Sequence, residues 1–322
     1  MNASSSTSGS DRRPRLAITA GDPRGIGPEI ISAALADPAV AALVDPVIVA
    51  PSGVGLRADV AIGDWHPELG AAGAGRLAGL AVETAARLAL AGEVEGIVTA
   101  PLDKAALLAG GYDYPGHTEM LAALTGRDVA MMLAAPGTAD AHPLRVILAT
   151  THIPLREVAD AVTADAIGRA ARVTREYLTL WFGVHEPRIA LCALNPHAGD
   201  GGRFGDEDQR LLAPAAREHG LLGPFPADTV FVRALRGAFD AVIAPYHDVG
   251  MTAIKVASFG RAVNVTLGLP FPRCSPDHGT ALDIAGRGIA DPSSFKAALR
   301  LCAEIALRVA PSTGAPAHAD AS

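Results

Sequence analysis

Short apolar runs recur along the chain, and clusters of polar residues follow most of them. Near-continuous apolar runs of this length are typical of parallel strands that are buried on both faces. We expect strands at residues 15–19, 46–50, 96–99, 144–149, 188–194 and 239–244. Helix-like segments such as 30–35 and 79–91 lie between strands, and this alternation predicts an α/β protein with a parallel sheet.

The stretch 240–291 repeats this pattern with an unusual supply of ionisable side chains. Its apolar runs alternate with clusters of His, Asp, Lys, Asn and Arg, as buried parallel strands followed by polar loops would. In open α/β sheets, ligands bind just beyond the carboxyl ends of the strands. We therefore expect this stretch to form a wall of the active site.

Three of the later strands are each followed, within a few residues, by a histidine: His152, His197 and His247. Parallel strands place their carboxyl ends on one edge of a sheet, so the three imidazoles are predicted to converge there. Three imidazoles with open positions suit a catalytic Zn²⁺ or a similar divalent ion. The spacings of 45 and 50 residues match no short metal motif. Helix caps or hydrogen-bonded loop histidines therefore remain alternatives on this pattern alone.

Composition narrows the class of protein. The 322 residues suit one large or two moderate domains, with 49% hydrophobic and 19% charged residues as in ordinary globular proteins. There is no apolar run of about 18 residues, which argues against a transmembrane helix. The net charge of −7 and the lack of a basic stripe argue against nucleic-acid binding. The three cysteines suggest neither a disulfide framework nor a Cys-x-x-Cys pair.

Both ends of the chain differ from the rest in composition. Residues 1–13 and 312–322 are rich in Ser, Gly, Ala and Pro, and we expect them to be disordered tails. The first residues lack the basic head and apolar core of a signal peptide. A cytoplasmic protein is therefore expected.

Several blocks then carry a resemblance to a known family. They are Asp-Pro-Arg-Gly-Ile-Gly-Pro-Glu at 22–29, Gly-His-Thr-Glu at 116–119, Ala-Thr-Thr-His at 149–152, Asn-Pro-His-Ala-Gly at 195–199, and most of 240–291. In this order they resemble the 4-hydroxythreonine-4-phosphate dehydrogenase family of vitamin B6 biosynthesis, over residues of about 15 to 305. Two departures stand out. Residues 51–75 are shorter than the family's segment, and Ala-Pro-Leu-Asp-Lys at 100–104 replaces Gly-Pro-Ile-Asn-Lys.

The resemblance implies a two-lobed α/β/α fold, like that of isocitrate and isopropylmalate dehydrogenases, with the active site in the cleft between the lobes. Residues 14–115 and 262–311 would form an outer lobe, and residues 116–261 a central lobe. The family also implies a homodimer in which both subunits build each active site.

Site residues follow from the same resemblance, position by position. His152, His197 and His247 fall on the family's metal ligands. The substrate contacts fall on His117, Thr118, Asp228, Lys255, Asn264 and Arg273. Lys and Arg suit a phosphate or a carboxylate, although a solvated Lys, a turn Asn and a surface Arg are ordinary alternatives. The loop His278, Gly279, Thr280 and Ala281 looks like the adenine-side loop of isopropylmalate and isocitrate dehydrogenases. No Gly-x-Gly-x-x-Gly fingerprint opens a strand–helix unit, so NAD binding is implied by resemblance alone.

The implied reaction is the NAD-linked oxidation of the C3 hydroxyl of 4-phosphohydroxy-L-threonine, assisted by a divalent ion (Zn²⁺, or else Mg²⁺ or Co²⁺), followed by decarboxylation. No general base is assigned, and Asp248 is interpreted as a residue that orients His247. Alternatives are a dehydrogenase of 4-phospho-D-threonate or 4-phospho-D-erythronate, or of an aromatic cis-dihydrodiol carboxylate. A phosphate acyltransferase of the same superfold and a non-catalytic metal-binding protein represent other classes.

Overall fold

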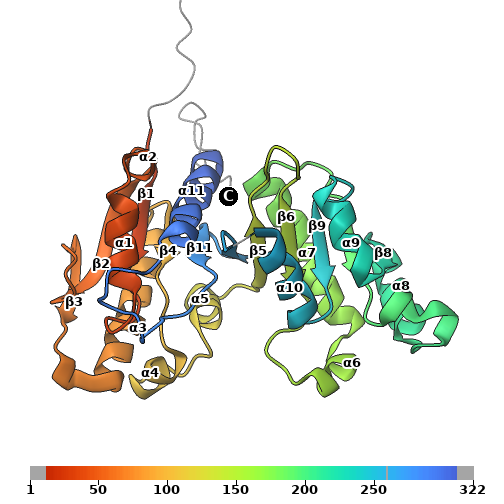
Figure 1. Cartoon of the computed structure of the whole chain (residues 1–322), viewed down its shortest axis with the longest axis horizontal. Helices are drawn as coiled ribbons and strands as arrows, with labels where there is room; N and C mark the ends of the chain where they lie inside the picture. The colour runs from red at the N-terminus through yellow and green to blue at the C-terminus, as the bar shows by residue number, and fades with distance from the viewer. Residues whose placement is uncertain (1–11, 259, 310–322) are drawn as a thin grey trace, which may run out of the picture.

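The computed structural model describes residues 12–258 and 260–309. Within these residues, eleven strands form one sheet, in the order β3-β2-β1-β4-β11-β10-β5-β6-β9-β7-β8. The predicted disordered tails fall outside the described residues, apart from Arg12 and Arg13. Figure 1 shows the strands of the first half of this order at one side of the molecule and those of the second half at the other.

The first half of the sheet is parallel. It consists of β1 (Arg15–Thr19), β2 (Asp45–Ser52), β3 (Val60–Asp64), β4 (Gly96–Thr99) and β11 (Arg273–Pro276). The bounds expected for β1 and β4 are confirmed. Both are apolar almost throughout and buried on both faces, so the sequence pattern marks where they begin and end.

The second half is parallel as well, and an antiparallel region joins it to the first. The parallel strands are β6 (Leu144–Leu148), β7 (Ile189–Cys192), β8 (Leu222–Phe225) and β9 (Ala241–Ala244). In the middle of the sheet, β10 (Val263–Leu267) is antiparallel to β11 and to β5 (Ala130–Ala135), and β5 is antiparallel to β6. The carboxyl ends of β6, β9 and β7 therefore lie together, as the histidine pattern predicted.

The expectation that the stretch 240–291 consists of buried parallel strands is wrong in two places. Residues 247–258 form a helix that buries Gly250, Ile254 and Ser258, one face at a spacing of four. In addition, β10 runs antiparallel to its neighbours. A short apolar run that is buried on both faces does not encode the direction of its strand, so the pattern could not reveal this.

Helices flank the sheet. They are α1 (Gly27–Leu35), α2 (Pro38–Ala41), α3 (Gly70–Leu90), α4 (Lys104–Ala109), α5 (His117–Thr125), α6 (Val158–Ala161), α7 (Ala164–Phe182), α8 (Ala213–Glu218), α9 (Ala227–Leu235), α10 (His247–Ser258) and α11 (Ser293–Val309). Short 3₁₀ turns cover Pro67–Leu69, Leu155–Glu157 and Pro196–Gly202, and a π-helical turn covers Asp208–Leu212. In the described residues, no helix is both long and apolar enough to cross a membrane.

The helix α3 begins nine residues before its expected start at residue 79. Its first half is rich in glycine, which usually weakens a helix. The glycines allow a close approach instead: a Cβ on Gly75 would lie 1.7 Å from the carbonyl oxygen of Ala106, and one on Gly79 would lie 2.2 Å from the ring of Tyr112. Packing against α4 and the residues after it therefore outweighs local propensity.

The largest hydrophobic cluster crosses the whole molecule. It joins Ile18 of β1 and Phe295 of α11 to Ile167 of α7 and Ile243 of β9, all of which are fully buried. The two halves of the sheet thus share a core, and α11 and α7 pack against each other. The division into lobes at residues 115, 261 and 311 stays a prediction.

Candidate active site

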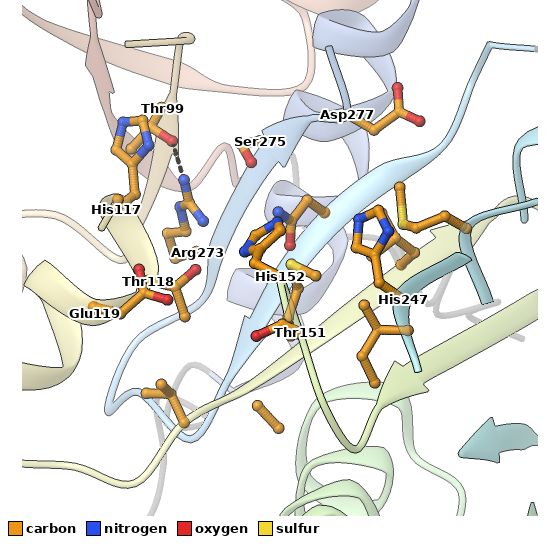
Figure 2. A pocket seen from close by; sticks show the side chains of 18 of the residues that line it. Thr99, His117, Thr118, Glu119, Thr151, His152, His247, Arg273, Ser275 and Asp277 are labelled. Atoms are coloured by element: carbon orange, nitrogen blue, oxygen red, sulfur yellow. Dashed lines mark hydrogen bonds between the residues drawn. The ribbon is translucent and has the colours of Figure 1, made fainter. Parts of the chain in front are cut away.

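A cavity of about 990 Å³ lies between the two halves of the sheet. Its walls come from the residues after β4, the start of α5, the residues after β6, α10, the two central strands β10 and β11, and the loop after β11. Figure 2 shows His152 and His247 beside each other, with Arg273, His117, Thr118 and Glu119 toward the other end of the site. Segments from most of the chain therefore meet here.

Arg273 is the largest buried side chain in the cavity wall, with 2% of its surface exposed. Its guanidinium donates from Nη1 to the hydroxyl of Thr266 at 3.0 Å and from Nη2 to the hydroxyl of Thr99. Its Nε has no hydrogen-bond partner, and no described carboxylate forms a salt bridge with it. Burial lowers the pKa of Arg273 to about 10. A buried cation without a counter-charge is costly, so this site is suited to an anionic ligand.

Three further polar atoms in the cavity wall are buried and lack hydrogen-bond partners among the described residues: Nε2 of His117, Oδ1 of Asn264 and Nε2 of His278. Burial lowers the pKa of His117 well below its usual value, and the charges of Arg273 and Lys104 lower it further. His117 is therefore neutral at neutral pH. Buried polar groups normally find partners, so a bound ligand is the natural partner for these atoms.

Lysines add positive charge at the rim of the cavity. Lys255 extends from α10, and its Nζ lies 4.0 Å from a carboxylate oxygen of Asp277. Lys104 is the first residue of α4, whose N-cap Asp103 accepts a hydrogen bond from the backbone of Ala106. Both lysines line the cavity. Together with Arg273 they suit a ligand that carries two anionic groups.

His152 and His247 lie side by side in the cavity wall, with ring centroids 5.3 Å apart. Nδ1 of His247 is hydrogen-bonded to Oδ1 of Asp248 at 2.7 Å, as predicted from the adjacent carboxylate, which leaves Nε2 for another partner. Burial lowers the pKa of His152, Lys104 and His247 lower it further, and Glu119 opposes them. Imidazole nitrogens are common metal ligands, so the two adjacent rings suit a divalent cation.

His197 does not join them. Its side chain is 67% exposed and does not line the cavity, and its Nδ1 lies 4.0 Å from a carboxylate oxygen of Asp228. Within residues 12–258 and 260–309, no three His, Cys, Asp or Glu side chains are grouped so that they could hold a metal ion. The chain by itself thus brings together two of the three predicted metal ligands. Asp228 likewise lies with His197 rather than with the other five predicted substrate contacts.

The backbone from His197 to Gly201 is left-handed, with φ between 43° and 81°. Successive residues other than glycine rarely adopt this conformation, because Cβ approaches the following carbonyl oxygen. Asp208, which is 1% exposed, fixes the residues just before this turn. Its two carboxylate oxygens accept the backbone N–H groups of Leu194 at 2.8 Å and of Asn195 at 2.9 Å.

The predicted cofactor loop divides between the cavity and its edge. His278 and Gly279 line the cavity, whereas Thr280 and Ala281 lie outside it. The carbonyl of Thr280 accepts the backbone N–H of Ile26 at 3.0 Å, which ties the loop to the turn before α1. A Cβ on Gly25 would lie 2.9 Å from that carbonyl oxygen, so this turn requires glycine. The resemblance to a cofactor loop thus coincides with a fixed position beside the cavity.

Among the residues of the cavity wall to which the sequence assigned no role, Thr99, Glu119 and Asp277 carry polar side chains that bear on a ligand. Thr99 is the last residue of an apolar strand and gave no signal of its own. Glu119 and Asp277 lie within the blocks that carry the family resemblance, beside Thr118 and His278. Their position next to predicted site residues could have indicated that they line the cavity.

Known proteins match most of this chain. The chain from 47 to 302 matches the family described as pyridoxal phosphate biosynthetic protein PdxA. It is 44% identical to the 4-hydroxythreonine-4-phosphate dehydrogenase of Stenotrophomonas maltophilia K279a, over 91% of this chain and 98% of that protein. It is 46% identical to the enzyme of that name from Xanthomonas axonopodis pv. citri, over 92% and 99%. The crystal structure of the enzyme of that name from Klebsiella pneumoniae superposes with a TM-score of 0.78 at 39% identity, covering 91% and 98%.

More distant structures share the fold alone. They are a branched-chain phosphotransacylase from Enterococcus faecalis, with a TM-score of 0.60 at 12% identity over 91% of this chain and 99% of the other, and an isocitrate dehydrogenase from Methylococcus capsulatus, with 0.50 at 17% over 91% and 85%. The predicted fold class, isocitrate dehydrogenase-like α/β, is therefore confirmed, and so is the prediction of an enzyme of the dehydrogenase class. The chain belongs to the PdxA family of pyridoxal phosphate biosynthetic proteins.

Proposed function

We propose that the protein oxidises the C3 hydroxyl of 4-phosphohydroxy-L-threonine with NAD and a divalent metal ion, and that the product loses CO₂ to give 3-amino-2-oxopropyl phosphate. The names of the relatives support this substrate. The observation that carries the proposal is Arg273, a fully buried cation without a carboxylate partner in the described chain. Such a site is adapted to a doubly charged group such as phosphate.

The other cavity residues divide the substrate between them. Thr118, His117 and Arg273 lie toward one end of the cavity (Figure 2), and Lys255 and Asn264 also line it, with Nζ of Lys255 4.0 Å from a carboxylate oxygen of Asp277. We assign the phosphate to the first group and the carboxylate to Lys255. The C3 hydroxyl then lies at the neighbouring rings of His152 and His247. The hydrogen bond of His247 Nδ1 to Asp248 leaves Nε2 of His247 for a cation.

The chemistry balances with a nicotinamide as the hydride acceptor. His152 and His247 would hold a divalent ion, Zn²⁺ or else Mg²⁺ or Co²⁺, which would supply Lewis acidity at the hydroxyl, and bound NAD would serve as the hydride acceptor. Oxidation removes the C3 hydrogen as hydride and the hydroxyl hydrogen as a proton. The resulting β-keto acid loses its carboxylate as CO₂, the electron pair of the broken bond forms an enol, and protonation at C2 gives the amino ketone. His278 and Gly279 would border the NAD site.

The position of His197 supports a homodimer with shared active sites. It is exposed, lies outside the cavity and stands on a left-handed turn that Asp208 fixes. We infer that the partner subunit supplies its own copy of this histidine, with Asp228 beside it, to complete the metal site of each cavity. A cytoplasmic location is part of the same proposal. The cytoplasm contains NAD, and it is a reducing compartment, which suits three free cysteines.

The test is NADH formation by the Zn²⁺-loaded protein with 4-phosphohydroxy-L-threonine, 4-phospho-D-threonate and 4-phospho-D-erythronate side by side. We expect the amino acid to be oxidised fastest, with one CO₂ released per NADH. Faster turnover of either sugar acid would refute the proposed substrate but not the assignment as a dehydrogenase. No NAD reduction with any of them would refute both.

A second candidate is the oxidation of an aromatic cis-dihydrodiol carboxylate. A terephthalate 1,2-cis-dihydrodiol dehydrogenase from Burkholderia xenovorans shares 31% identity with this chain, with a TM-score of 0.58 over 91% of this chain and 98% of the other. Such a diol has no phosphate for Arg273, so we expect no turnover of it. A phosphate acyltransferase, the other class of this fold, would need neither NAD nor metal, and metal analysis of the purified protein separates the two.

A further inference from the structure

Four carboxylates line the cavity, and three of them have a partner within it or at its edge. The pairs are Asp248 Oδ1 with His247 Nδ1 at 2.7 Å, Asp277 Oδ2 with Lys255 Nζ at 4.0 Å, and Asp128 Oδ2 with Arg172 Nη2 at 3.7 Å. The fourth, Glu119, makes neither a hydrogen bond nor a salt bridge with any described residue. It is the one acidic side chain of the cavity left for a ligand in the part of the chain that the structure describes.

Glu119 lies in the first turn of α5, directly after His117 and Thr118. Its carboxylate is close to the cations of the site: a Cβ built on Gly116 would lie 3.5 Å from Oε2 of Glu119 and 3.7 Å from Cε of Lys104. Its charge also raises the pKa of Arg273 against the larger effect of burial. Figure 2 shows Glu119 and Thr118 on the side of the cavity that holds Arg273.

The positive charges of the cavity explain why an unpaired carboxylate indicates which ligand binds there. Lys104, Lys255 and Arg273 suit the phosphate and the carboxylate of a substrate. An additional acidic group repels both of these anions unless the ligand carries a positive group between them. A phosphorylated sugar acid has no such group. An amino acid phosphate does, in its C2 ammonium.

We propose that Glu119 binds the amino group of the substrate and thereby selects 2-amino-3-hydroxy acid phosphates over their 2-hydroxy counterparts. The inference rests on the proposed function, which makes the substrate a phosphorylated 3-hydroxy acid. It adds the residue that recognises the substituent on C2. A carboxylate accepts charge-assisted hydrogen bonds from an ammonium group, and these are about twice as strong as neutral ones. A hydroxyl at C2 can donate a neutral bond, which the amide of a glutamine accepts nearly as well.

The test measures binding rather than turnover, in the Zn²⁺-loaded protein without NAD. Titration calorimetry gives the Kd of 4-phosphohydroxy-L-threonine, 4-phospho-D-threonate and 4-phospho-D-erythronate for the wild type, Glu119→Gln and the control Glu186→Gln, an exposed carboxylate outside the cavity. We expect Glu119→Gln to weaken binding of the amino acid by about 10- to 100-fold, and to leave binding of either sugar acid unchanged or tighter, because a repulsion is removed. Glu186→Gln should change neither.

Two results would overturn the inference. One is an equal loss for all three ligands, which would mean that Glu119 only maintains the cavity. The other is unchanged binding of the amino acid, which would mean that Glu119 does not contact it. Inorganic phosphate, titrated in parallel, must bind Glu119→Gln at least as tightly as it binds the wild type, because the substitution removes a negative charge; this shows that the Arg273 site is intact. The titration measures binding and not oxidation, so its result can be interpreted even if the dehydrogenase assay fails.

Discussion

Nη2 of Arg273 donates a hydrogen bond to Oγ1 of Thr99 at 2.5 Å, although the two residues are 174 positions apart. Thr99 ends β4 and Arg273 begins β11, and the two strands are parallel neighbours in the sheet. The cation that we assign to the substrate phosphate is thus built into the middle of the sheet. Its geometry depends on the fold and not on a flexible loop, which is how a precise site is held.

The first prediction concerns Arg273→Met. Without the guanidinium, the affinity for phosphorylated substrates should fall by at least about 100-fold, because a charge-assisted bidentate contact is lost. The free energy of unfolding of the ligand-free protein should change by no more than about 1 kcal/mol or should rise, because a desolvated charge without a carboxylate partner is removed. Urea unfolding and substrate titration measure the two quantities.

Arg273→Lys and a surface variant complete this experiment. The lysine keeps a charge but not the fork of donors, so its affinity should lie between those of the wild type and Arg273→Met. Arg217→Met, at an exposed position of α8, should match the wild type in both measurements. A large loss of stability in Arg273→Met would show that the arginine serves the fold and not a ligand.

The second prediction concerns the pH dependence of stability. The pKa of His117 in the folded protein is well below that of the unfolded chain, which is about 6.5. Below about pH 6.5 the unfolded chain therefore binds a proton that the folded chain does not, and stability falls with pH by up to about 1.4 kcal/mol per unit. In His117→Gln this contribution is absent.

Urea unfolding of both proteins between about pH 7.5 and about pH 5 provides the measurement. The difference in the free energy of unfolding should shift in favour of His117→Gln as the pH falls. The other histidines contribute equally to both proteins and cancel. Parallel profiles would show that His117 is not desolvated as its surroundings indicate.

The third prediction concerns Asp208, which holds the residues before the His197 turn through two backbone N–H groups. Asp208→Asn offers one acceptor and turns an amide N–H₂ toward the other donor. We expect a loss of about 1–3 kcal/mol in stability and faster hydrogen exchange at the amides of Leu194 and Asn195. Asp206→Asn, whose exposed carboxylate pairs with Arg210, should leave both unchanged. Unaltered exchange in Asp208→Asn would contradict this assignment.

The outcome of sequence reasoning differs between strands and loops for physical reasons. The apolar run 96–99 predicted β4 to the residue, because burial on both faces demands a continuous run. His152 and His247 were correctly brought together, because parallel strands end at a common edge. The antiparallel direction of β10 was missed, since a strand buried on both faces reads the same in either direction.

His197 shows where a single sequence stops being informative. Its strand β7 was predicted, yet the position of its side chain is decided by a left-handed turn and by the buried Asp208. Neither follows from hydrophobic periodicity. A ligand supplied by a second subunit would leave no mark on the pattern of one chain, because the pattern records which residues are buried and not which chain they serve.

The last prediction tests whether His197 acts in its own subunit or in the partner. His197→Ala and His247→Ala should each be inactive and should bind metal weakly, while both remain folded because the two side chains are partly exposed. Mixed, unfolded and refolded in equal amounts, they give heterodimers in half of the dimers. If His197 serves the partner's cavity, each heterodimer contains one site with an intact His247 and an intact His197 and one site that lacks both. Activity per subunit should then recover to about one quarter of the wild type, with metal content to match.

A histidine that serves its own subunit would leave every site with one ligand missing, and mixing would restore nothing. His197→Ala mixed with His152→Ala should behave like the first pair, whereas His152→Ala mixed with His247→Ala should stay inactive, because those two imidazoles already share one cavity.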